Sequence, residues 1–487
     1  MKVVVLGGGI SGLAAAFYAK SHAQVTVIAG QNVGGWVQTK LTNGRLLEAG
    51  PRSLRPSGES ARSMLELVYA LGLDKQVLPV PAKSPAALNR FIYSGGSLHN
   101  LPANPLKMII ENSPVIKGLV SSVLKEPFQP KSSNLDESIH EFVSRRLGAH
   151  IADNLVSAVI HGVYAGDIKK LSIRSTLNVL WNAEQNHGSL SKYALSSMFS
   201  KSPLVEPNPD KECQAFVDKM VKGKIYSFSN GMQQLTDTLR DNIVKDGVQI
   251  IHRNCHSVAN DVNQHKNSKM DGSSQIKVSL DDGSTLYADH VISTIPSINF
   301  AEVIPTAFSA LSNDLKSIES VDVAVVNLVY QNSKLEHEGF GFLVPKPEFK
   351  NMDILGVVYD SCSFPKQSTS KPNEVKLTVM LGGYVFLEKF GPVQQVSKEK
   401  LLQVSVDAVE KALKFKPENL IDSLVSVHEK CIPQYYVGHY DKVKRIEKEL
   451  SKSFNGNLSI TGASYNGVSL NDCVHNSKTL VSKIFAK

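Results

Sequence analysis

The sequence predicts a mixed α/β and α+β fold in which a Rossmann-like dinucleotide-binding domain is assembled from discontinuous segments. A glycine-rich turn joins a short apolar strand to a helix at the start of the chain, and α/β patterning returns near the end. Between them lie a mostly helical stretch and a strand-rich stretch. Because no internal repeat is visible, we expect these two stretches to form domains inserted into the nucleotide-binding fold.

The composition is that of an ordinary globular protein. Of 487 residues, 42% are hydrophobic and 20% charged, which excludes disorder, collagen and coiled coil as the main theme. The 53 Lys and Arg residues against 45 Asp and Glu give a formal charge of +8, spread along the chain, which suits an anionic surface or substrate. The five cysteines lack a CxxC pair and the histidines lack HExxH or HxxEH spacing, so we expect reduced thiols and no metal site.

The first unit is predicted as strand, turn, helix and strand, at residues 2–6, 7–12, 13–20 and 24–29. Short apolar runs around Gly95-Gly96 then predict a hairpin within residues 88–101. A largely helical stretch follows to about residue 205, with a linker expected over residues 201–211.

Strand signals return in the second half of the chain. We expect strands at residues 224–228, 248–252, 276–280, 290–294, 321–330, 353–359, 375–385 and 458–461, and a final helix over residues 474–485. The polar segment 260–274 is expected to be a loop.

One apolar face in the helical stretch fits two interpretations. Its members recur at helical spacing and have Lys117 and Lys125 among them; they are Val115, Ile116, Leu119, Val120, Val123 and Leu124. The pattern suits a core helix and an interfacial membrane helix equally. No window is apolar for long enough to span a bilayer, and a strand beginning at Lys2 leaves no room for a presequence, so any organelle address is expected to be internal.

The turn Gly7-Gly8-Gly9-Ile10-Ser11-Gly12 matches GxGxxG between a strand and a helix. Its glycines provide the tight turn, close approach of backbone to a pyrophosphate, and helix–sheet packing, while the helix amides face the phosphates. A turn without a ligand is the less favoured alternative, and both nicotinamide and flavin dinucleotides use this motif. Further close-approach segments follow at Gly34-Gly35-Trp36, Glu48-Ala49-Gly50-Pro51-Arg52-Ser53 and Thr461–Val468.

At these residues the chain resembles the oxygen-dependent protoporphyrinogen oxidases, within the amine oxidase and phytoene desaturase superfamily. The resemblance rests on VVVLGGGISGLAAA, GGW, EAGPRSLRP, ALNRFIYSGGSLHNLP, HGVYAGD, LSIRS, HVISTIP, VAVVNLVYQ, VMLGG, CIPQY and GASYNGVSLND. It runs from Lys2 to about Asn471, nearly the whole chain.

The resemblance implies an enzyme of haem biosynthesis that holds FAD non-covalently. The implied reaction is the six-electron oxidation of protoporphyrinogen IX to protoporphyrin IX, by three hydride transfers to FAD with oxygen as acceptor and hydrogen peroxide released. It also implies three regions: an FAD-binding domain (residues 1–87, 206–297 and 437–487), a helical membrane-associated domain (88–205) and a mixed-sheet substrate domain (298–436). This raises the interfacial interpretation of residues 115–124 above the core one.

The family's site residues are carried over position by position. Those expected to contact FAD are Gly7, Gly8, Gly9, Ile10, Ser11, Gly12, Trp36, Gly50, Pro51, Arg52, Ser53, His256, Ala463, Val468, Ser469 and Leu470. Arg90 matches the arginine expected at a substrate propionate, and Leu328 and Met380 match the apolar residues that hold the macrocycle over the flavin. No catalytic residue is assigned; backbone carbonyls or water are candidate acceptors for the pyrrole protons.

Two departures from the family pattern stand out. The second strand ends at Ala29, where an acidic residue about 20 residues after the turn usually binds the adenosine ribose, so Gln31 or Asn32 is expected to take over. His161 stands where the animal enzymes have arginine, so a propionate-side or loop contact is expected to differ.

Other interpretations of the same residues stay open. Without the resemblance, the pattern around Arg90 predicts a surface-pointing or structurally paired arginine. In the same way, Leu328 and Met380 would be interpreted as core residues of buried strands. Alternative functions are another flavin oxidoreductase of the superfamily and a porphyrin-binding flavoprotein without turnover.

The resemblance also implies a location and partners. It places the protein at the mitochondrial inner membrane, peripheral or monotopic, with a membrane surface as partner and no nucleic acid. A homodimer and transfer of protoporphyrin IX to the enzyme that next receives it are further expectations.

Overall fold

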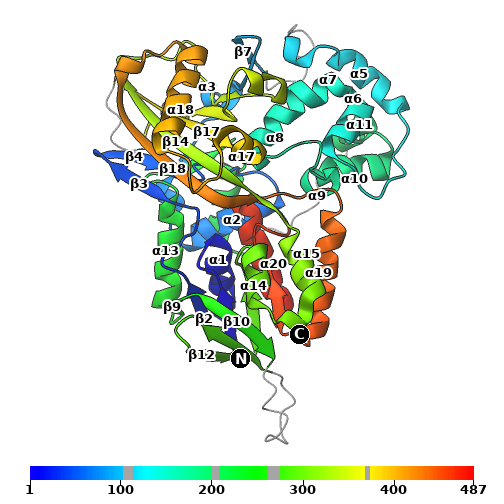
Figure 1. Ribbon diagram of the computed structural model, residues 1–487, viewed down its shortest axis with the longest axis vertical. Helices are drawn as coiled ribbons and strands as arrows, with labels where there is room; N and C mark the ends of the chain where they lie inside the picture. Colours follow the sequence, from blue (N-terminus) through cyan, green and yellow to red (C-terminus); the bar gives the residue numbers. More distant parts are fainter. Residues whose placement is uncertain (102–112, 200–207, 261–274, 368–372, 487) are drawn as a thin grey trace, which may run out of the picture.

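The computed structural model describes residues 1–101, 113–199, 208–260, 275–367 and 373–486. Figure 1 shows a parallel sheet with its helices in the lower half, where both chain ends lie, a larger sheet at the upper left and a group of helices at the upper right.

The lower half is built on a five-stranded parallel sheet in the order β19-β13-β1-β2-β9. Its strands are β1 (Lys2–Leu6), β2 (Gln24–Ala29), β9 (Gln249–His252), β13 (His290–Ser293) and β19 (Leu458–Ile460). Both faces are buried, because Val3 and Val5 join one core cluster while Val4 and Leu6 join another. Segments from the beginning, middle and end of the chain therefore supply one sheet, as predicted.

Helices cover one face of this sheet, and a small sheet and further helices cover the other. On the first face lie α1 (Ile10–Ala19), α2 (Glu59–Ala70), α13 (Gln233–Lys245) and α20 (Leu470–Phe485). On the second lie β10 (Cys255–Asn260), β11 (Ile276–Leu280), β12 (Thr285–Ala288), α14 (Ser297–Val303), α15 (Ser309–Lys316) and α19 (His439–Ser453). Two layers around a parallel sheet are what its continuously apolar strands require.

The upper left of Figure 1 is a seven-stranded mixed sheet in the order β18-β14-β17-β16-β15-β6-β7. Its strands are β6 (Phe91–Ser94), β7 (Ser97–Asn100), β14 (Ser320–Gln331), β15 (Gly341–Leu343), β16 (Gly356–Tyr359), β17 (Glu374–Gly382) and β18 (Leu420–Pro433). The predicted hairpin forms, but it extends this sheet, since β6 pairs in parallel with β15. The expected boundary of the helical domain at residue 88 is therefore wrong. The partner strand β15 lies about 250 residues further along the chain, so no local pattern indicates the pairing.

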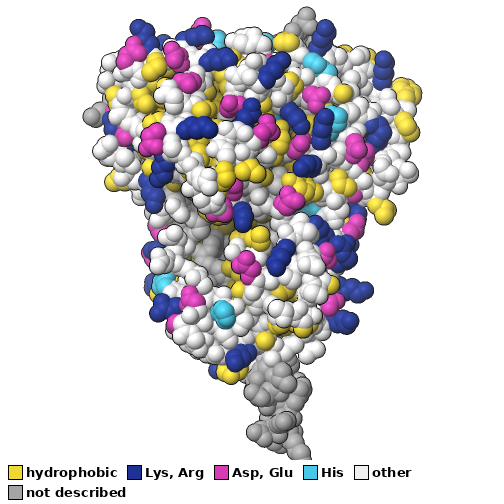
Figure 2. All heavy atoms as spheres, viewed as in Figure 1, with side chains coloured by type: hydrophobic (Ala, Val, Ile, Leu, Met, Phe, Trp, Pro, Cys, Tyr) yellow, Lys and Arg dark blue, Asp and Glu magenta, His cyan; other side chains and the backbone are white. Residues whose placement is uncertain are grey.

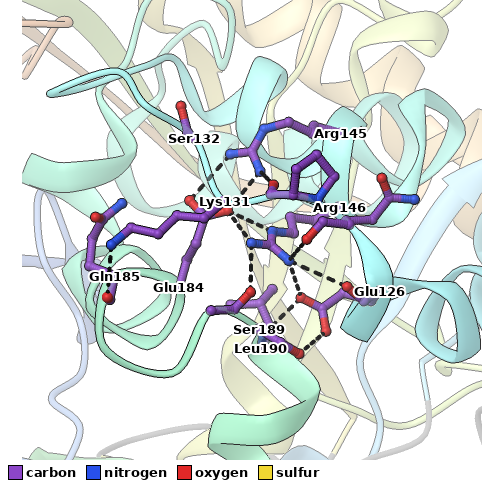
Figure 3. Close-up of polar contacts among 12 residues, drawn as sticks. Glu126, Lys131, Ser132, Arg145, Arg146, Glu184, Gln185, Ser189 and Leu190 are labelled. Carbon is purple, nitrogen blue, oxygen red and sulfur yellow. Dashed lines mark hydrogen bonds and ion pairs between the residues drawn. The ribbon is translucent and has the colours of Figure 1, made fainter.

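The helical region at the upper right is joined by a buried ion cluster. Its elements are α5 (Leu119–Lys125), α6 (Ile139–Leu147), α7 (Ala149–Ile151), α8 (Ser157–Tyr164), α9 (Ile173–Thr176), α10 (Asn178–His187) and α11 (Leu190–Phe199). Figure 3 shows Arg146 of α6 between Glu126 and Glu184 of α10, with Arg145 also directed at Glu184. Arg146 lies 3.0 Å from Glu126, and Arg145 lies 2.6 Å from Glu184. The side chains of Arg146 and Glu184 are fully buried, so this cluster fixes three helical segments relative to one another.

The expectation of one apolar helical face over residues 115–124 is wrong. Val115 and Ile116 lie in a separate 3₁₀ turn, Pro114–Ile116, and are buried. The chain then turns at Gly118, whose φ is +82°, before α5 begins. A residue in that conformation cannot continue a helix, so the face is divided into a buried half and an exposed half.

The exposed half carries apolar side chains on the surface. In α5 and the turn after it Leu124 is 70% exposed and Phe128 87%. Among the described residues, the helices are all too short or too polar to cross a membrane.

Several other boundaries differ from the expected ones. Strands β3 (Thr39–Thr42), β4 (Arg45–Glu48), β5 (Val77–Pro79) and the long β18 were not predicted, while β8 (Tyr226–Phe228) is shorter than expected. The predicted linker lies mainly outside the described residues and its end runs into α12 (Lys211–Met220). The loop predicted over residues 260–274 lies almost entirely outside them.

Candidate functional site

The turn between β1 and α1 is packed so closely that it requires glycine at three positions. Gly7 has φ +110° and donates its N–H to the carbonyl of Ile28 at 2.8 Å. A Cβ at Gly12 would lie 1.8 Å from the Gly7 carbonyl oxygen, and one at Gly8 would lie 2.5 Å from the Cβ of Ala29. These contacts seat the first turn of α1 directly on the strand ends, as a dinucleotide turn does.

Gly9 differs from its neighbours because it faces open space. Among the described residues, nothing lies within 4 Å of a Cβ built on Gly9. Gly9 also begins α1 without a side-chain cap, and the first turn of the helix carries no acidic residue. The free amides at this helix start and the open face of Gly9 fit the pyrophosphate of a dinucleotide.

Two further glycine segments close around this turn. Gly34 donates its N–H to the Gly8 carbonyl at 2.8 Å, and a Cβ at Gly35 would lie 3.2 Å from the Cα of Gly9. A Cβ at Gly50 would lie only 2.1 Å from the carbonyl oxygen of Trp36. We call these residues (Gly7–Gly9, Gly12, Gly34, Gly35 and Gly50) the glycine cradle; the ring of Trp36 is 43% exposed beside it.

The C-terminal loop, residues 462–469, lies against the same turn. Gly462 has φ +108°, and a Cβ there would lie 3.5 Å from the hydroxyl of Ser11. Ser469 caps α20 through a reciprocal pair of bonds with Asp472, so the helix begins at Leu470, four residues earlier than predicted. Ala463 and Leu470 pack against the core cluster that contains α1, whereas Val468 packs against the core of the helical region.

The loop after β4 connects the cradle to the seven-stranded sheet. Its Arg52 is 8% exposed and lies 3.3 Å from the carboxylate of Asp360, which also accepts a hydrogen bond from the Thr378 hydroxyl at 2.7 Å. Pro51 and Ser53 flank Arg52 and are half-buried. Arg52 is therefore held by an ion pair inside the protein.

Glu48, at the start of this loop, was missed by the sequence reasoning as a functional candidate. It is 4% exposed and accepts hydrogen bonds from the Met232 N–H and the Thr39 hydroxyl, each at 2.8 Å. Burial raises the pKa of Glu48 to about 7, although both hydrogen bonds lower it. A buried carboxyl that titrates near neutral pH beside the cradle is the kind of group that functional sites contain.

Three residues expected on the adenosine side, and the departure at Ala29, lie at or just after the end of β2 and in β10. His256 sits at a bulge in β10, where the register passes from Cys255 to Ser257, so its backbone is left out of the ladder. Ala29 ends β2 against Gly8, and Gln31 and Asn32 beyond it are exposed.

Leu328 and Met380 do not meet. Leu328 pairs with Leu377 across β14 and β17, whereas Met380 pairs with Val325, so the two side chains face opposite sides of the sheet. Asn327, on the Met380 side, donates to the carbonyl of Glu48 at 2.9 Å, so that side of the sheet faces the end of β4 and the loop after it. Leu328 is fully buried on the other side, beneath α18 (Lys398–Leu413).

The register supplies a different neighbour for Met380. Gly356 pairs with Met380 on one side and with Leu343 on the other, so all three lie in one row on the same face. Leu343 is half-buried and covers Gly356, since a Cβ there would lie 2.9 Å from a Leu343 methyl group. No local sequence pattern could have indicated Leu343, because a three-residue strand leaves almost no periodicity.

Arg90 is exposed directly before the first residue of β6, which lies between β15 and β7 in this sheet. Partial burial and the nearby positive charge of Arg55 lower its pKa. Within the described residues, neither arginine is paired with a carboxylate. Asn471 fixes the backbone of Arg55 by donating to its carbonyl at 2.9 Å. Two guanidinium groups so placed are suited to binding anions.

His161 is packed inside the protein. Its Nδ1 donates to the carbonyl of Val344 at 2.8 Å, and its ring stacks on Phe349 at 4.7 Å. Burial lowers the pKa of His161 to about 4, so the imidazole is neutral at physiological pH. It thus supports the loop after β15 and offers no positive charge to a propionate.

The fold and the glycine cradle define a dinucleotide-binding protein, and comparison with known proteins specifies its class. The family described as flavin containing amine oxidoreductase matches residues 10–481. A protoporphyrinogen oxidase from Homo sapiens is 37% identical over 485 residues, covering 98% of this chain and 96% of its own. A coproporphyrinogen III oxidase from Bacillus subtilis is 27% identical over 497 residues, covering 99% and 97%.

A crystal structure from Exiguobacterium sp. 255-15 shares the fold, with a TM-score of 0.74 at 23% identity and coverage of 99% and 98%. The chain belongs to the flavin-containing amine oxidoreductases and, within them, to the protoporphyrinogen oxidases. It is an FAD-dependent enzyme, as the sequence predicted, and the glycine cradle has the geometry to hold that cofactor.

Proposed function

We propose that this chain oxidises protoporphyrinogen IX to protoporphyrin IX, with three molecules of oxygen as final acceptor and three of hydrogen peroxide as by-product. The observation that carries the proposal is 37% identity with a protoporphyrinogen oxidase over nearly the whole of both chains. The glycine cradle and the apolar row beside it support the same reaction. FAD, when bound, supplies the chemistry by taking up electrons in pairs from the substrate and passing them to oxygen.

For the cofactor, we propose that FAD lies along the glycine cradle. The start of α1, with Ile10, Ser11 and the open Gly9, would hold the pyrophosphate. Trp36 and the loop of Gly50, Pro51, Arg52 and Ser53 would contact the flavin half together with Ala463, Val468, Ser469 and Leu470. His256 would approach the adenine half through its backbone, and Gln31 or Asn32 would bind the ribose in place of the absent carboxylate.

The substrate part of the proposal uses the face of the sheet that looks toward Glu48. Met380, Gly356 and Leu343 form an apolar row on that face, which suits a flat macrocycle. Arg90 and Arg55 at its edge suit two carboxylates. We therefore propose Leu343 for the place first given to Leu328, which points into the α18 side.

An anaerobic titration tests this function. The purified yellow protein should be bleached by protoporphyrinogen IX with one substrate molecule reducing three flavins, and air should restore the colour. Bleaching by amines or polyenes instead would indicate another oxidoreductase of the superfamily, and porphyrin binding without bleaching would indicate a carrier. A parallel titration with coproporphyrinogen III separates the two porphyrinogens; faster reduction by coproporphyrinogen III would overturn the choice of substrate.

We also propose that FAD is held without a covalent bond, because neither cysteine nor histidine stands in a recognisable attachment motif. Acid or heat should release all of the flavin into the supernatant. Flavin that remains with the denatured chain would contradict this.

For the helical region we propose attachment to a membrane surface without spanning. Leu124 and Phe128 are exposed near Lys125, and Figure 2 shows apolar side chains at the upper right edge, over the helical region of Figure 1. Such a surface suits the boundary between headgroups and acyl chains. Leu124→Ser with Phe128→Ser should reduce binding to anionic vesicles, whereas Leu41→Ser, at a side chain 76% exposed on β3, should not. Equal loss in both variants would refute the proposed surface.

The remaining finer assignments stay part of the proposal. They are the mitochondrial inner membrane as location, a homodimer, transfer of product to the enzyme that next receives protoporphyrin IX, and the three domains given above, with the hairpin β6–β7 moved from the helical domain to the substrate domain because it belongs to the seven-stranded sheet. The scattered charges visible in Figure 2, with Asp and Glu between the Lys and Arg side chains, do not form one basic surface on that face.

A further inference from the structure

One side chain, that of Tyr435, binds the C-terminal loop at two points. The hydroxyl of Tyr435 donates to the carbonyl of Ala463 and accepts the N–H of Gly467 at 2.8 Å. Ala463 and Gly467 stand on either side of the turn in this loop, so one oxygen atom sets the distance across it. The loop has few alternatives, because Gly462 and Gly467 both occupy the left-handed region, with φ +108° and +115°.

Tyr435 is itself rigidly held. It is 1% exposed, and its ring stacks on His439 with centroids 4.0 Å apart. Its own carbonyl accepts the N–H of Ser172 at 2.8 Å, at the beginning of α9. His439 in turn reaches the same loop, with Nε2 donating to the carbonyl of Tyr465 at 2.9 Å. Burial holds the pKa of Tyr435 well above its usual range, so the hydroxyl keeps the proton that it donates.

The C-terminal loop that Tyr435 holds lies against the first turn of α1. Gly462 packs against Ser11 in the first turn of α1, and Ser477 of α20 donates to the Ser11 carbonyl at 3.0 Å. The loop thus forms one wall beside the glycine cradle. A dinucleotide in the cradle would meet the backbone of this loop, whose position depends on Tyr435.

We infer that Tyr435 is a positioning residue for the flavin, because its hydroxyl fixes the backbone of residues 463–467 against the cradle. Tyr435 touches neither cofactor nor substrate in this account; it acts through the loop. The inference rests on the FAD-dependent function proposed above, and it identifies a residue from the CIPQY motif that the sequence reasoning used only for family resemblance.

The test removes the hydroxyl oxygen of Tyr435. Tyr435→Phe keeps the ring and its stacking but leaves the Ala463 carbonyl and the Gly467 N–H without their partner. We expect FAD binding to the apoprotein to weaken about fivefold to tenfold, as the loss of a net hydrogen bond predicts. The midpoint potential of the bound flavin should also fall, because loosened backbone dipoles stabilise the reduced, anionic ring less well.

Tyr330→Phe is the matched control. Tyr330 is also fully buried, and its hydroxyl has no hydrogen-bond partner among the described residues. It lies on β14 on the same side as Leu328, away from the loop after β4. Removal of the Tyr330 hydroxyl should leave both the FAD dissociation constant and the midpoint potential of the flavin unchanged.

The outcomes are decisive because both readouts are made without porphyrinogen. A change in FAD affinity or potential in Tyr435→Phe, beyond that in Tyr330→Phe, supports the inference even if another substrate is found. If the two variants match in both quantities, Tyr435 is only structural, whatever its effect on melting temperature. Should Tyr435→Phe not fold, Asn476→Ala decides: Asn476 donates to the loop carbonyl of Asn466 at 2.6 Å, and normal FAD affinity there would overturn the inference.

Discussion

The guanidinium of Arg52 lies 3.3 Å from the carboxylate of Asp360, and this ion pair joins two parts of the chain that are 308 residues apart. The side chains are 8% and 16% exposed, so water screens the pair only slightly. Thr378 donates to the same carboxylate at 2.7 Å. The loop proposed to contact the flavin is thereby fastened to the sheet that carries Met380.

Breaking this pair from one side should be costly. Asp360→Ala leaves the Arg52 guanidinium buried without its partner, and we expect the free energy of unfolding to fall by about 3 to 5 kcal/mol. The double variant Asp360→Ala with Arg52→Met should recover part of this loss. Urea unfolding with excess FAD measures both. Removing Asp282, whose partner Arg253 is on the surface, serves as the control and should have little effect. Equal losses in the single and double variants would show that the pair itself contributes nothing.

The raised pKa of Glu48 predicts a specific pH dependence of stability. The folded state holds a proton on Glu48 up to about pH 7, whereas the unfolded chain releases it near pH 4.5. Between these values the folded state binds more protons, so the Glu48 contribution to stability is lost as pH rises. Relative to Glu48→Gln, the wild type should lose about 2 to 3 kcal/mol between pH 5 and pH 8. Parallel curves for the two proteins would mean that Glu48 is ionised throughout.

The ion cluster of Figure 3 should be essential for the helical region. Arg146 donates to Glu126 at 3.0 Å, to the Gly188 carbonyl at 3.0 Å and to Glu184, all in the interior. Arg146→Ala leaves two carboxylates buried without that partner, and we expect a loss of about 3 to 5 kcal/mol. Arg146→Lys should rescue little, since an ammonium cannot reproduce the planar fork.

Hydrogen exchange localises the effect of these Arg146 variants. Protection should fall within residues 113–199, while the five-stranded sheet keeps its protection. Arg174→Ala, which removes an exposed ion pair with Asp441, is the control. Unchanged protection of α6 and α10 in Arg146→Ala would refute the role given to the cluster.

Local sequence patterns were sufficient for the elements whose signals are local. The strands β1, β2 and β11 have the predicted bounds, because each is a short apolar run with a turn signal beside it. The glycine turn could also be predicted from the sequence, since its three tight contacts need residues without a Cβ. The family and the cofactor followed from these motifs together.

The predictions that were wrong concern contacts between distant segments, which no local sequence pattern contains. Leu328 and Met380 each lie in a buried strand, but only the register of β14 with β17 decides that they face opposite sides. The apolar spacing over residues 115–124 was real, yet Gly118 and the preceding 3₁₀ turn divide it. Glu48, Arg55 and Asp360 became candidates only when the fold brought distant segments together.

The charged edge of the proposed substrate site gives the last prediction. A porphyrinogen is a bulky apolar ring with propionates, so a few fixed cations should orient it in an otherwise apolar site. Arg90→Ala should remove a charge-assisted contact of about 1.5 to 3 kcal/mol, which corresponds to roughly a tenfold to hundredfold loss in kcat/KM. Arg55→Ala should act in the same direction. If the two arginines bind different carboxylates, the double variant should show the sum of the two losses in free energy.

Steady-state kinetics with flavin content measured alongside tests this arrangement. FAD content should stay normal in both variants, because neither arginine belongs to the glycine cradle. Arg90→Lys should rescue only part of the activity, since an ammonium offers no bidentate fit to a carboxylate. Arg253→Ala, at an exposed arginine in the bend between β9 and β10, should leave kcat/KM unchanged. An unchanged kcat/KM in Arg90→Ala, or loss of flavin in step with activity, would make Arg90 a structural residue and move the substrate away from the start of β6.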